Sequence, residues 1–173
     1  MGIPNLWSSL QDCGQDVTLS RLAEIIPPDQ REVCGSRFPD QCIYLGIDVA
    51  GWLFHARKGL GGKSPWLRVM FWRMCRLSTV PFVFPVFVFD GVHRPANKRG
   101  KQVYRDIFET PGQISTFVSD FKTIIDAFGF MWIDAPGEAE AELADLNHRG
   151  LIDCIMSDDV DCFLFGAEVV VRK

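Results

Sequence analysis

Six carboxylates stand in four short motifs of this chain, and each motif follows an apolar run. The motifs are GID, VFD, GEAEAE and SDDVD, and the acids are Asp48, Asp90, Glu138, Glu140, Asp159 and Asp161. No histidine or cysteine is an obvious partner, so the donors are hard oxygens, which suit Mg²⁺ or Mn²⁺ and disfavour a structural zinc site. Two such ions about 4 Å apart stabilise both the attacking and leaving oxygens of phosphodiester cleavage. The motifs therefore predict metal-dependent hydrolysis.

Each acid also has a structural interpretation. An Asp at a strand end often caps a turn or a helix, which applies to Asp48 and Asp90 taken singly. Glu138 falls in the first turn of an expected helix, where it complements the dipole. Glu140 lies about 200° further around that helix, so both glutamates reach one site only if the turn points end-on at it. Asp158 is ambiguous, because it suits the N-cap of the next turn. Acidic residues at four strand ends favour the metal site, since converging carboxylates repel unless cations neutralise them.

Apolar periodicity predicts strands that alternate with helices. Strands are expected over residues 42–49, 85–89, 130–133, 152–156 and 168–171. Helices are expected over residues 50–57, 65–77, 111–128 and 137–149. Trp66 and Trp72 are interpreted as packing residues, and segment 91–105 as a basic loop or a partly formed helix. The pattern is typical of an α/β fold with a mostly parallel central sheet and helices on both faces, in which ligands bind beyond the carboxyl ends of the strands.

The charges are unevenly distributed along the 173 residues, whose formal net charge is −4. Eleven basic residues and one acid lie between Val49 and Arg105, whereas nine acids and one base lie between Asp134 and Asp161. This asymmetry favours a basic surface for a polyanion beside an acidic cluster for cations, with ordinary solvated helix faces as the alternative. The six cysteines contain no CxxC pair and are interpreted as reduced thiols. The longest apolar run is too short to span a membrane.

Five ordered motifs resemble the flap endonuclease and XPG superfamily of structure-specific 5′ nucleases. They are MGIPNLW, GIDVAGWLF, VFVFDG, APGEAEAELADL and SDDVDCFLFGA. Within the superfamily they are most similar to the fungal Holliday-junction resolvase branch. The resemblance implies a PIN-like nuclease core that uses two Mg²⁺ ions, with Mn²⁺ as an alternative, to cut branched or 5′-flap DNA. It also implies that the six acids are the catalytic metal ligands. The implied DNA-binding residues are Gly2, Arg94, Lys98, Arg99, Lys101 and Arg105.

The resemblance also implies a domain organisation. Residues 1–173 are expected to form one PIN-like domain, with an N-terminal part over about 1–105, an internal part over about 111–173 and a basic arch-like segment over 91–105. Family members continue with another metal-binding Asp and a helix-two-turn-helix element. We therefore expect a C-terminally truncated core whose cleavage is impaired.

Three further functions are compatible with the same residues. They are a catalytically silent DNA-binding or interaction domain, an RNA-cutting PIN nuclease, and a phosphatase built on Asp159-Val160-Asp161. We expect a nuclear protein, with the cytoplasm as the second possibility, and neither a membrane partner nor a small-molecule cofactor. The preferred branch geometry, the pathway and the oligomeric state do not follow from the sequence.

Overall fold

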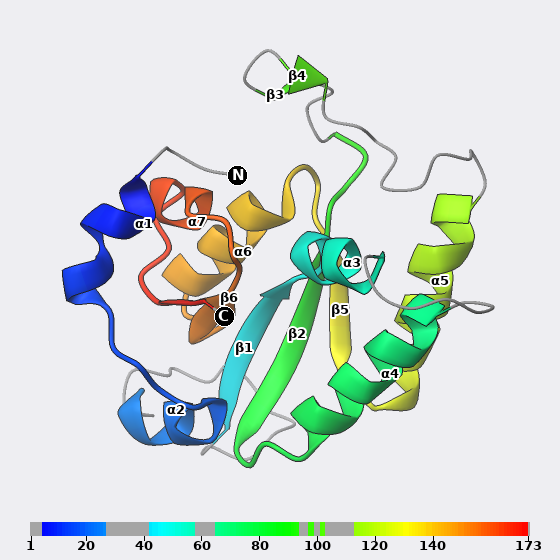
Figure 1. Cartoon of the computed structure of the whole chain (residues 1–173), viewed down its shortest axis with the longest axis horizontal. Coiled ribbons are helices and arrows are strands. Elements are labelled where there is room, and N and C mark those ends of the chain that lie inside the picture. Colours follow the sequence, from blue (N-terminus) through cyan, green and yellow to red (C-terminus); the bar gives the residue numbers. More distant parts are fainter. Residues whose placement is uncertain are drawn as a thin grey trace.

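A five-stranded parallel sheet organises the chain. The computed structural model describes residues 5–26, 42–57, 65–93, 97–98, 101–102 and 113–172 (Figure 1). The sheet order is β5-β2-β1-β6-β7. The strands are β1 (Ile43–Asp48), β2 (Val83–Phe89), β5 (Met131–Asp134), β6 (Cys154–Met156) and β7 (Val170–Val171). All four neighbouring pairs are parallel, which confirms the predicted α/β class.

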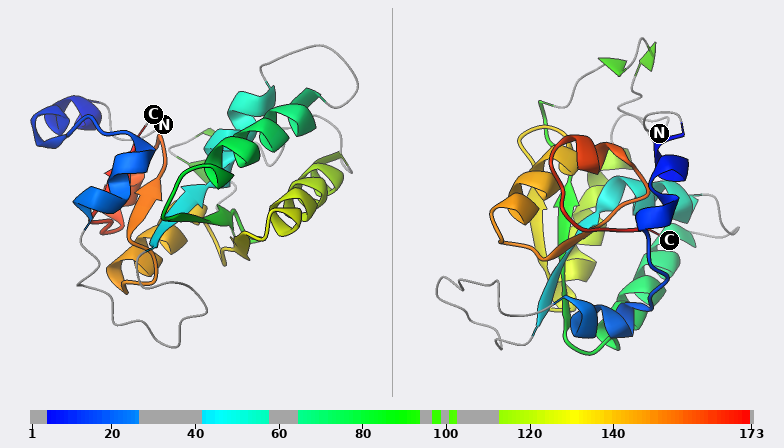
Figure 2. Two further views of the ribbon diagram at one scale, coloured as in Figure 1. Left: turned by 90° about the horizontal axis from the view of Figure 1, so that it is seen from below. Right: turned by 90° about the vertical axis from the view of Figure 1, so that its left-hand side faces the viewer.

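Helices cover both faces of the sheet, as predicted. They are α1 (Leu6–Ser9), the 3-10 helix η1 (Gln11–Cys13), α2 (Leu19–Ile25), α3 (Val49–Arg57), α4 (Pro65–Ser78), α5 (Gln113–Ala127), α6 (Ala139–His148) and α7 (Asp161–Leu164). Figure 2 shows α4 and α5 on one side of the sheet and α6 and α7 on the other. Among the described residues, no helix combines the length and the apolar character that a membrane crossing needs.

The alternation of side chains along the central strands builds two cores. Leu45 and Ile47 of β1 join Phe87 and Phe89 of β2 in the core beneath α3, α4 and α5. Val86 and Val88 face the opposite way, into the core beneath α6. Asp48 and Asp90 continue this second alternation. The two acids therefore leave the strands on the side where α6 lies.

Gly46 and Gly91 allow close packing around these strand ends. A Cβ atom on Gly46 would overlap the side chains of Ile152 and Leu143, so the glycine lets α6 lie against β1. A Cβ atom on Gly91 would overlap the backbone oxygen of Ala135. The Gly91 N–H donates to the Gly137 carbonyl at 2.7 Å, so the chain after β2 runs beside the chain after β5.

The connections reverse direction at β1. The chain moves outward from β1 to β2 and β5, and then crosses through α6 to β6 on the other side of β1. Loops after β1 and β6 thus leave in opposite directions, and such a switch point at the carboxyl ends of the strands is the usual place for a ligand in an open α/β sheet. Asp48 ends β1 and Asp159 follows β6 at this point.

Several expected elements differ from the structure. The helix predicted over 137–149 begins at Ala139. Among the described residues of segment 91–105, the short antiparallel strands β3 (Asn97–Lys98) and β4 (Lys101–Gln102) were not predicted. Trp66 packs on Phe117, with ring centroids 3.8 Å apart, as expected. Trp72 is 61% exposed, so its interpretation as a packing residue is wrong.

Candidate metal centre

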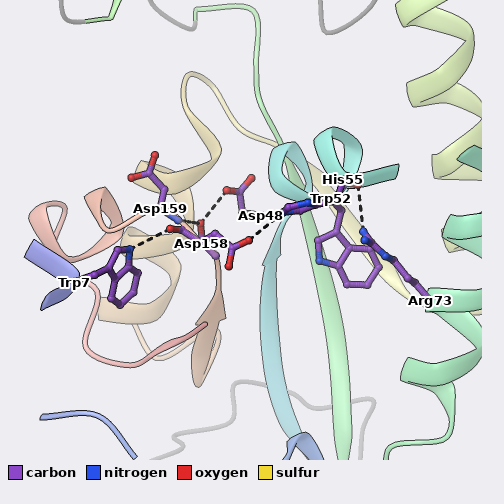
Figure 3. Close-up of polar contacts among 8 residues, drawn as sticks. Trp7, Asp48, Trp52, His55, Arg73, Asp158 and Asp159 are labelled. Atoms are coloured by element: carbon purple, nitrogen blue, oxygen red, sulfur yellow. Dashed lines mark hydrogen bonds and ion pairs between the residues drawn. The ribbon is translucent and has the colours of Figure 1, made fainter. Parts of the chain in front are cut away.

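Asp48 is a buried carboxylate at the end of β1. Only 6% of the residue is exposed. Its Oδ1 accepts the Ala50 N–H at 2.9 Å. Its Oδ2 accepts the Ser157 hydroxyl at 3.0 Å, one of the dashed contacts of Asp48 in Figure 3. The two bonds fix the side chain between the start of α3 and the loop after β6. The prediction that Asp48 belongs to a turn is thus also correct, because the Ala50 contact is an Asx-type bond.

Burial and neighbouring charges raise the pKa of Asp48 to about 6. Burial is the largest cause, and the negative charge of Asp90 is the second. The hydrogen bonds from Ser157 and Ala50 lower the pKa, and the charge of Asp159 raises it. The negative charges of Asp90, which follows β2, and of Asp159, in the loop after β6, therefore repel the charge of Asp48 in the metal-free protein. A bound cation would relieve this repulsion.

Asp90 joins the end of β2 to the start of α6. Its Oδ1 accepts the Ala139 N–H at 3.0 Å, so it satisfies a backbone donor in the first turn of that helix. Glu138 is the N-cap residue, with an extended backbone, and not a first-turn residue as predicted. Because Glu138 precedes the helix, the expected separation of about 200° from Glu140 does not apply. Sequence periodicity places helix ends only approximately, which explains the error.

Glu140, Asp159 and Asp161 form a three-carboxylate cluster. One carboxylate oxygen of each residue lies within 4.8 Å of the other two. The Asp161 N–H donates to Asp159 Oδ1 at 3.0 Å, and the Asp159 N–H donates to the Ser157 Oγ at 3.1 Å. Oxygen donors this close suit Mg²⁺ or Mn²⁺, with waters completing the coordination shell. The donor set therefore fits the predicted ions.

The chain resembles known nucleases in sequence. Residues 129–173 match the XPG I-region family model. The chain is 29% identical over 189 residues to human Flap endonuclease GEN homolog 1. The match covers 100% of this chain and 19% of that protein. It is 30% identical over 153 residues to Flap endonuclease GEN of Drosophila melanogaster, covering 75% of this chain and 21% of the relative.

Solved nucleases share the fold. A crystal structure of the Holliday junction-resolving enzyme GEN1 in complex with product DNA and Mg²⁺ has a TM-score of 0.71 and 31% identity, covering 99% of this chain and 36% of that chain. The catalytic core of Rad2 in complex with DNA substrate has a TM-score of 0.73 and 27% identity, covering 98% and 49%. The chain belongs to the XPG/flap endonuclease superfamily. It spans about a fifth of the length of the GEN relatives from human and fly.

This result confirms the predicted superfamily, whereas the fungal branch stays a prediction. The XPG I-region match contains Glu138, Glu140, Asp159 and Asp161. Another GEN1 structure contains both Mg²⁺ and Mn²⁺, the two ions that the sequence predicts.

Asp158 points away from the carboxylate cluster of this XPG-family fold. Its Oδ2 lies 3.4 Å from Nε2 of His55 on α3, and its carbonyl accepts the Trp7 indole N–H at 3.2 Å (Figure 3). The N-cap of α7 is Val160, so the cap interpretation of Asp158 is wrong. Asp158 instead connects the loop after β6 to Trp7 of α1 and to His55 of α3. Sequence reasoning missed this junction because its partners are separated by about a hundred residues or more.

Cys162 and Ser157 are two further residues of the XPG-family site that the motifs did not predict. Burial raises the pKa of the Cys162 thiol to about 12, and the charges of Asp48 and Glu140 add to the rise. The thiol is therefore neutral at physiological pH and no nucleophile. Ser157 is 5% exposed. Its only sequence signal is its position as the first residue of SDDVD.

The predicted DNA-binding residues are only partly described. Gly2, Arg94, Arg99 and Arg105 lie outside the described residues. Lys98 and Lys101 are paired in the backbone register of β3 and β4. Their assignment to DNA stays a prediction.

Proposed function

We propose that this chain is the catalytic core of a structure-specific endonuclease that hydrolyses phosphodiester bonds in branched or 5′-flap DNA. One observation carries the proposal: carboxylates from separate chain segments meet at the carboxyl edge of a parallel sheet. Glu140 comes from α6, while Asp159 and Asp161 come from the segment after β6. The similarity to the GEN flap endonucleases, and to GEN1 and Rad2 in complex with DNA, supports DNA as the substrate.

The six acids would together coordinate Mg²⁺ or Mn²⁺. Glu140, Asp159 and Asp161 supply the closest oxygens. Asp48 accepts a hydrogen bond from the loop after β6, and Asp90 accepts one from the start of α6, which holds both at the same edge of the sheet. Glu138 stands at the N-cap of α6 as the sixth ligand. Bound divalent ions would activate a water and neutralise charge on the scissile phosphate, and we propose two ions.

The DNA would contact the basic half of the chain. The stretch from Val49 to Arg105 carries eleven basic residues against a single acid. Figure 1 shows β3 and β4 beyond the carboxyl ends of β1 and β2, the side where the carboxylates lie. We propose that Gly2, Arg94, Lys98, Arg99, Lys101 and Arg105 contact the DNA. Phosphate contacts of this kind make affinity fall as salt rises.

Family membership supports the remaining features of the proposal. Residues 1–173 are one PIN-like domain, with parts over about 1–105 and about 111–173 and an arch-like segment over 91–105. We place the protein in the nucleus, where branched DNA arises. The second candidate is a catalytically silent DNA-binding domain, which would bind branched DNA without cutting it.

A substrate comparison tests the proposal. The purified chain is incubated in excess over labelled 5′-flap DNA, four-way-junction DNA, a matched RNA and a phosphomonoester, with Mg²⁺ or EDTA. We expect Mg²⁺-dependent cutting of branched DNA that Glu140→Gln abolishes, and no turnover of the RNA or the phosphomonoester. Cutting that survives EDTA or Glu140→Gln would refute the metal centre. Mg²⁺-dependent binding of branched DNA with no cutting would favour the silent domain. Preferred hydrolysis of the RNA would favour an RNA-cutting nuclease, and preferred hydrolysis of the phosphomonoester would favour a phosphatase.

A further inference from the structure

Ser157 links Asp48 to Asp159, a member of the three-carboxylate cluster. Its hydroxyl donates to Asp48 Oδ2 at 3.0 Å and accepts the Asp159 N–H at 3.1 Å. We propose that Ser157 is a positioning residue of the metal centre. Its hydroxyl holds the Asp48 carboxylate and the Asp159 backbone in fixed relative positions, so that both residues can serve one ion site. This inference rests on the proposed function, because it concerns the same site.

The Ser157 hydroxyl both donates and accepts a hydrogen bond. A serine hydroxyl has one proton and two acceptor lone pairs. Asp48 takes the proton, because an ionised carboxylate only accepts, and the Asp159 N–H occupies one lone pair. One buried atom therefore links the end of β1 to the loop after β6.

An alanine at position 157 keeps one backbone contact of the serine. The Ser157 N–H donates to the Val171 carbonyl at 3.3 Å, a contact that an alanine keeps. Asp48 would lose one of its two donors, and the Asp159 N–H would lose its acceptor. Substituting a residue that orients a metal ligand through a hydrogen bond typically lowers metal affinity by about 10-fold to 100-fold. We expect a loss of that size for Ser157→Ala.

The test compares wild type with Ser157→Ala, Ser157→Thr and the exposed control Ser119→Ala. Mn²⁺ affinity is measured by calorimetric titration with MnCl₂. Amide hydrogen exchange of Asp159 is measured by NMR without metal, which reports the hydroxyl contact independently of any ion. Ser157→Ala is expected to weaken Mn²⁺ binding about 10-fold to 100-fold and to speed Asp159 exchange several-fold. Ser157→Thr, which keeps the hydroxyl, should restore both, and Ser119→Ala should change neither.

The outcomes separate this inference from the proposed function. A wild-type chain that binds no Mn²⁺ would refute the proposed function before any variant is compared. A wild-type chain that binds Mn²⁺, with equal affinity in Ser157→Ala, would overturn the role of Ser157 alone. Faster Asp159 exchange without weaker Mn²⁺ binding would overturn it too, because the hydroxyl would then serve the fold and not the ion. If Ser157→Ala does not fold, Ser157→Cys, a weak donor of similar size, takes its place with the same expected loss.

Discussion

Substituting Asp48 by Asn should stabilise the metal-free protein at neutral pH. The pKa of Asp48 rises from its ordinary value of 3.8 to about 6, chiefly through burial. Each pKa unit corresponds to about 1.4 kcal/mol, so ionised Asp48 lowers the free energy of unfolding by about 3 kcal/mol. Asn has nearly the same shape and keeps an oxygen for the Ala50 N–H, but it carries no charge. Asp48→Asn should therefore remove most of this penalty.

The direction of the pH dependence follows from proton binding. Below the unfolded pKa both states hold the proton, and Asp48 costs nothing. Between that value and about 6 the unfolded chain releases its proton while the folded chain retains it, so the stability of the wild type falls as pH rises. The gain in the free energy of unfolding from Asp48→Asn is thus small at about pH 4 and approaches about 3 kcal/mol at about pH 8.

Urea unfolding at a series of pH values, with EDTA present, measures this gain. The control is Asp145→Asn, since Asp145 is exposed on α6 and pairs with Arg149 at 3.1 Å; its effect should stay within about 0.5 kcal/mol at every pH. Mn²⁺ should then stabilise the wild type more than Asp48→Asn, because only the wild type keeps the charged ligand. A gain from Asp48→Asn that does not grow with pH would refute the argument that buried charge is concentrated at the site.

Three other substitutions test the packing, the cluster and the junction. Gly91→Ala should lower the free energy of unfolding, measured in urea, by about 1–3 kcal/mol, because the added Cβ would overlap the backbone of Ala135. Gly137→Ala, where the added Cβ meets open space, should not lower it. Equal effects of the two substitutions would contradict the close approach of the chain after β2 to the chain after β5. Glu140→Gln should weaken Mn²⁺ binding at least about tenfold in calorimetry while the fold persists, and unchanged affinity would remove it from the ligand set. His55→Ala should cost less than about 1 kcal/mol in thermal unfolding, because His55 and Asp158 are half exposed, and a larger loss would show that the junction stabilises the fold.

The strand-end acids could be predicted because two simple rules apply to them. Apolar runs such as the one before Asp48 mark buried parallel strands, and parallel strands place their carboxyl ends at one edge. The sequence therefore predicts the strands β1 and β2 within two residues, together with the position of Asp90. The helices α4 and α5 follow from their spacing of apolar residues.

The rest of the site depends on contacts between distant residues. Ser157 and Asp158 carry no signal of their own, because their partners Asp48, Trp7 and His55 are brought to them only by the tertiary fold. The helices α1 and α2 also escape prediction, since they are short and α1 buries none of its residues. The prediction for Trp72 is wrong because an apolar residue type does not by itself place a side chain in the core.

The central claim is that carboxylates from separate chain segments hold one divalent ion between them. Anomalous diffraction from crystals of the chain soaked in MnCl₂, with data collected near the manganese absorption edge, tests it most directly. The claim predicts an anomalous peak in bonding contact with the carboxylate oxygens of Glu140, Asp159 and Asp161. Well-diffracting crystals that show no such peak, or Mn²⁺ bound only elsewhere on the surface, would contradict it.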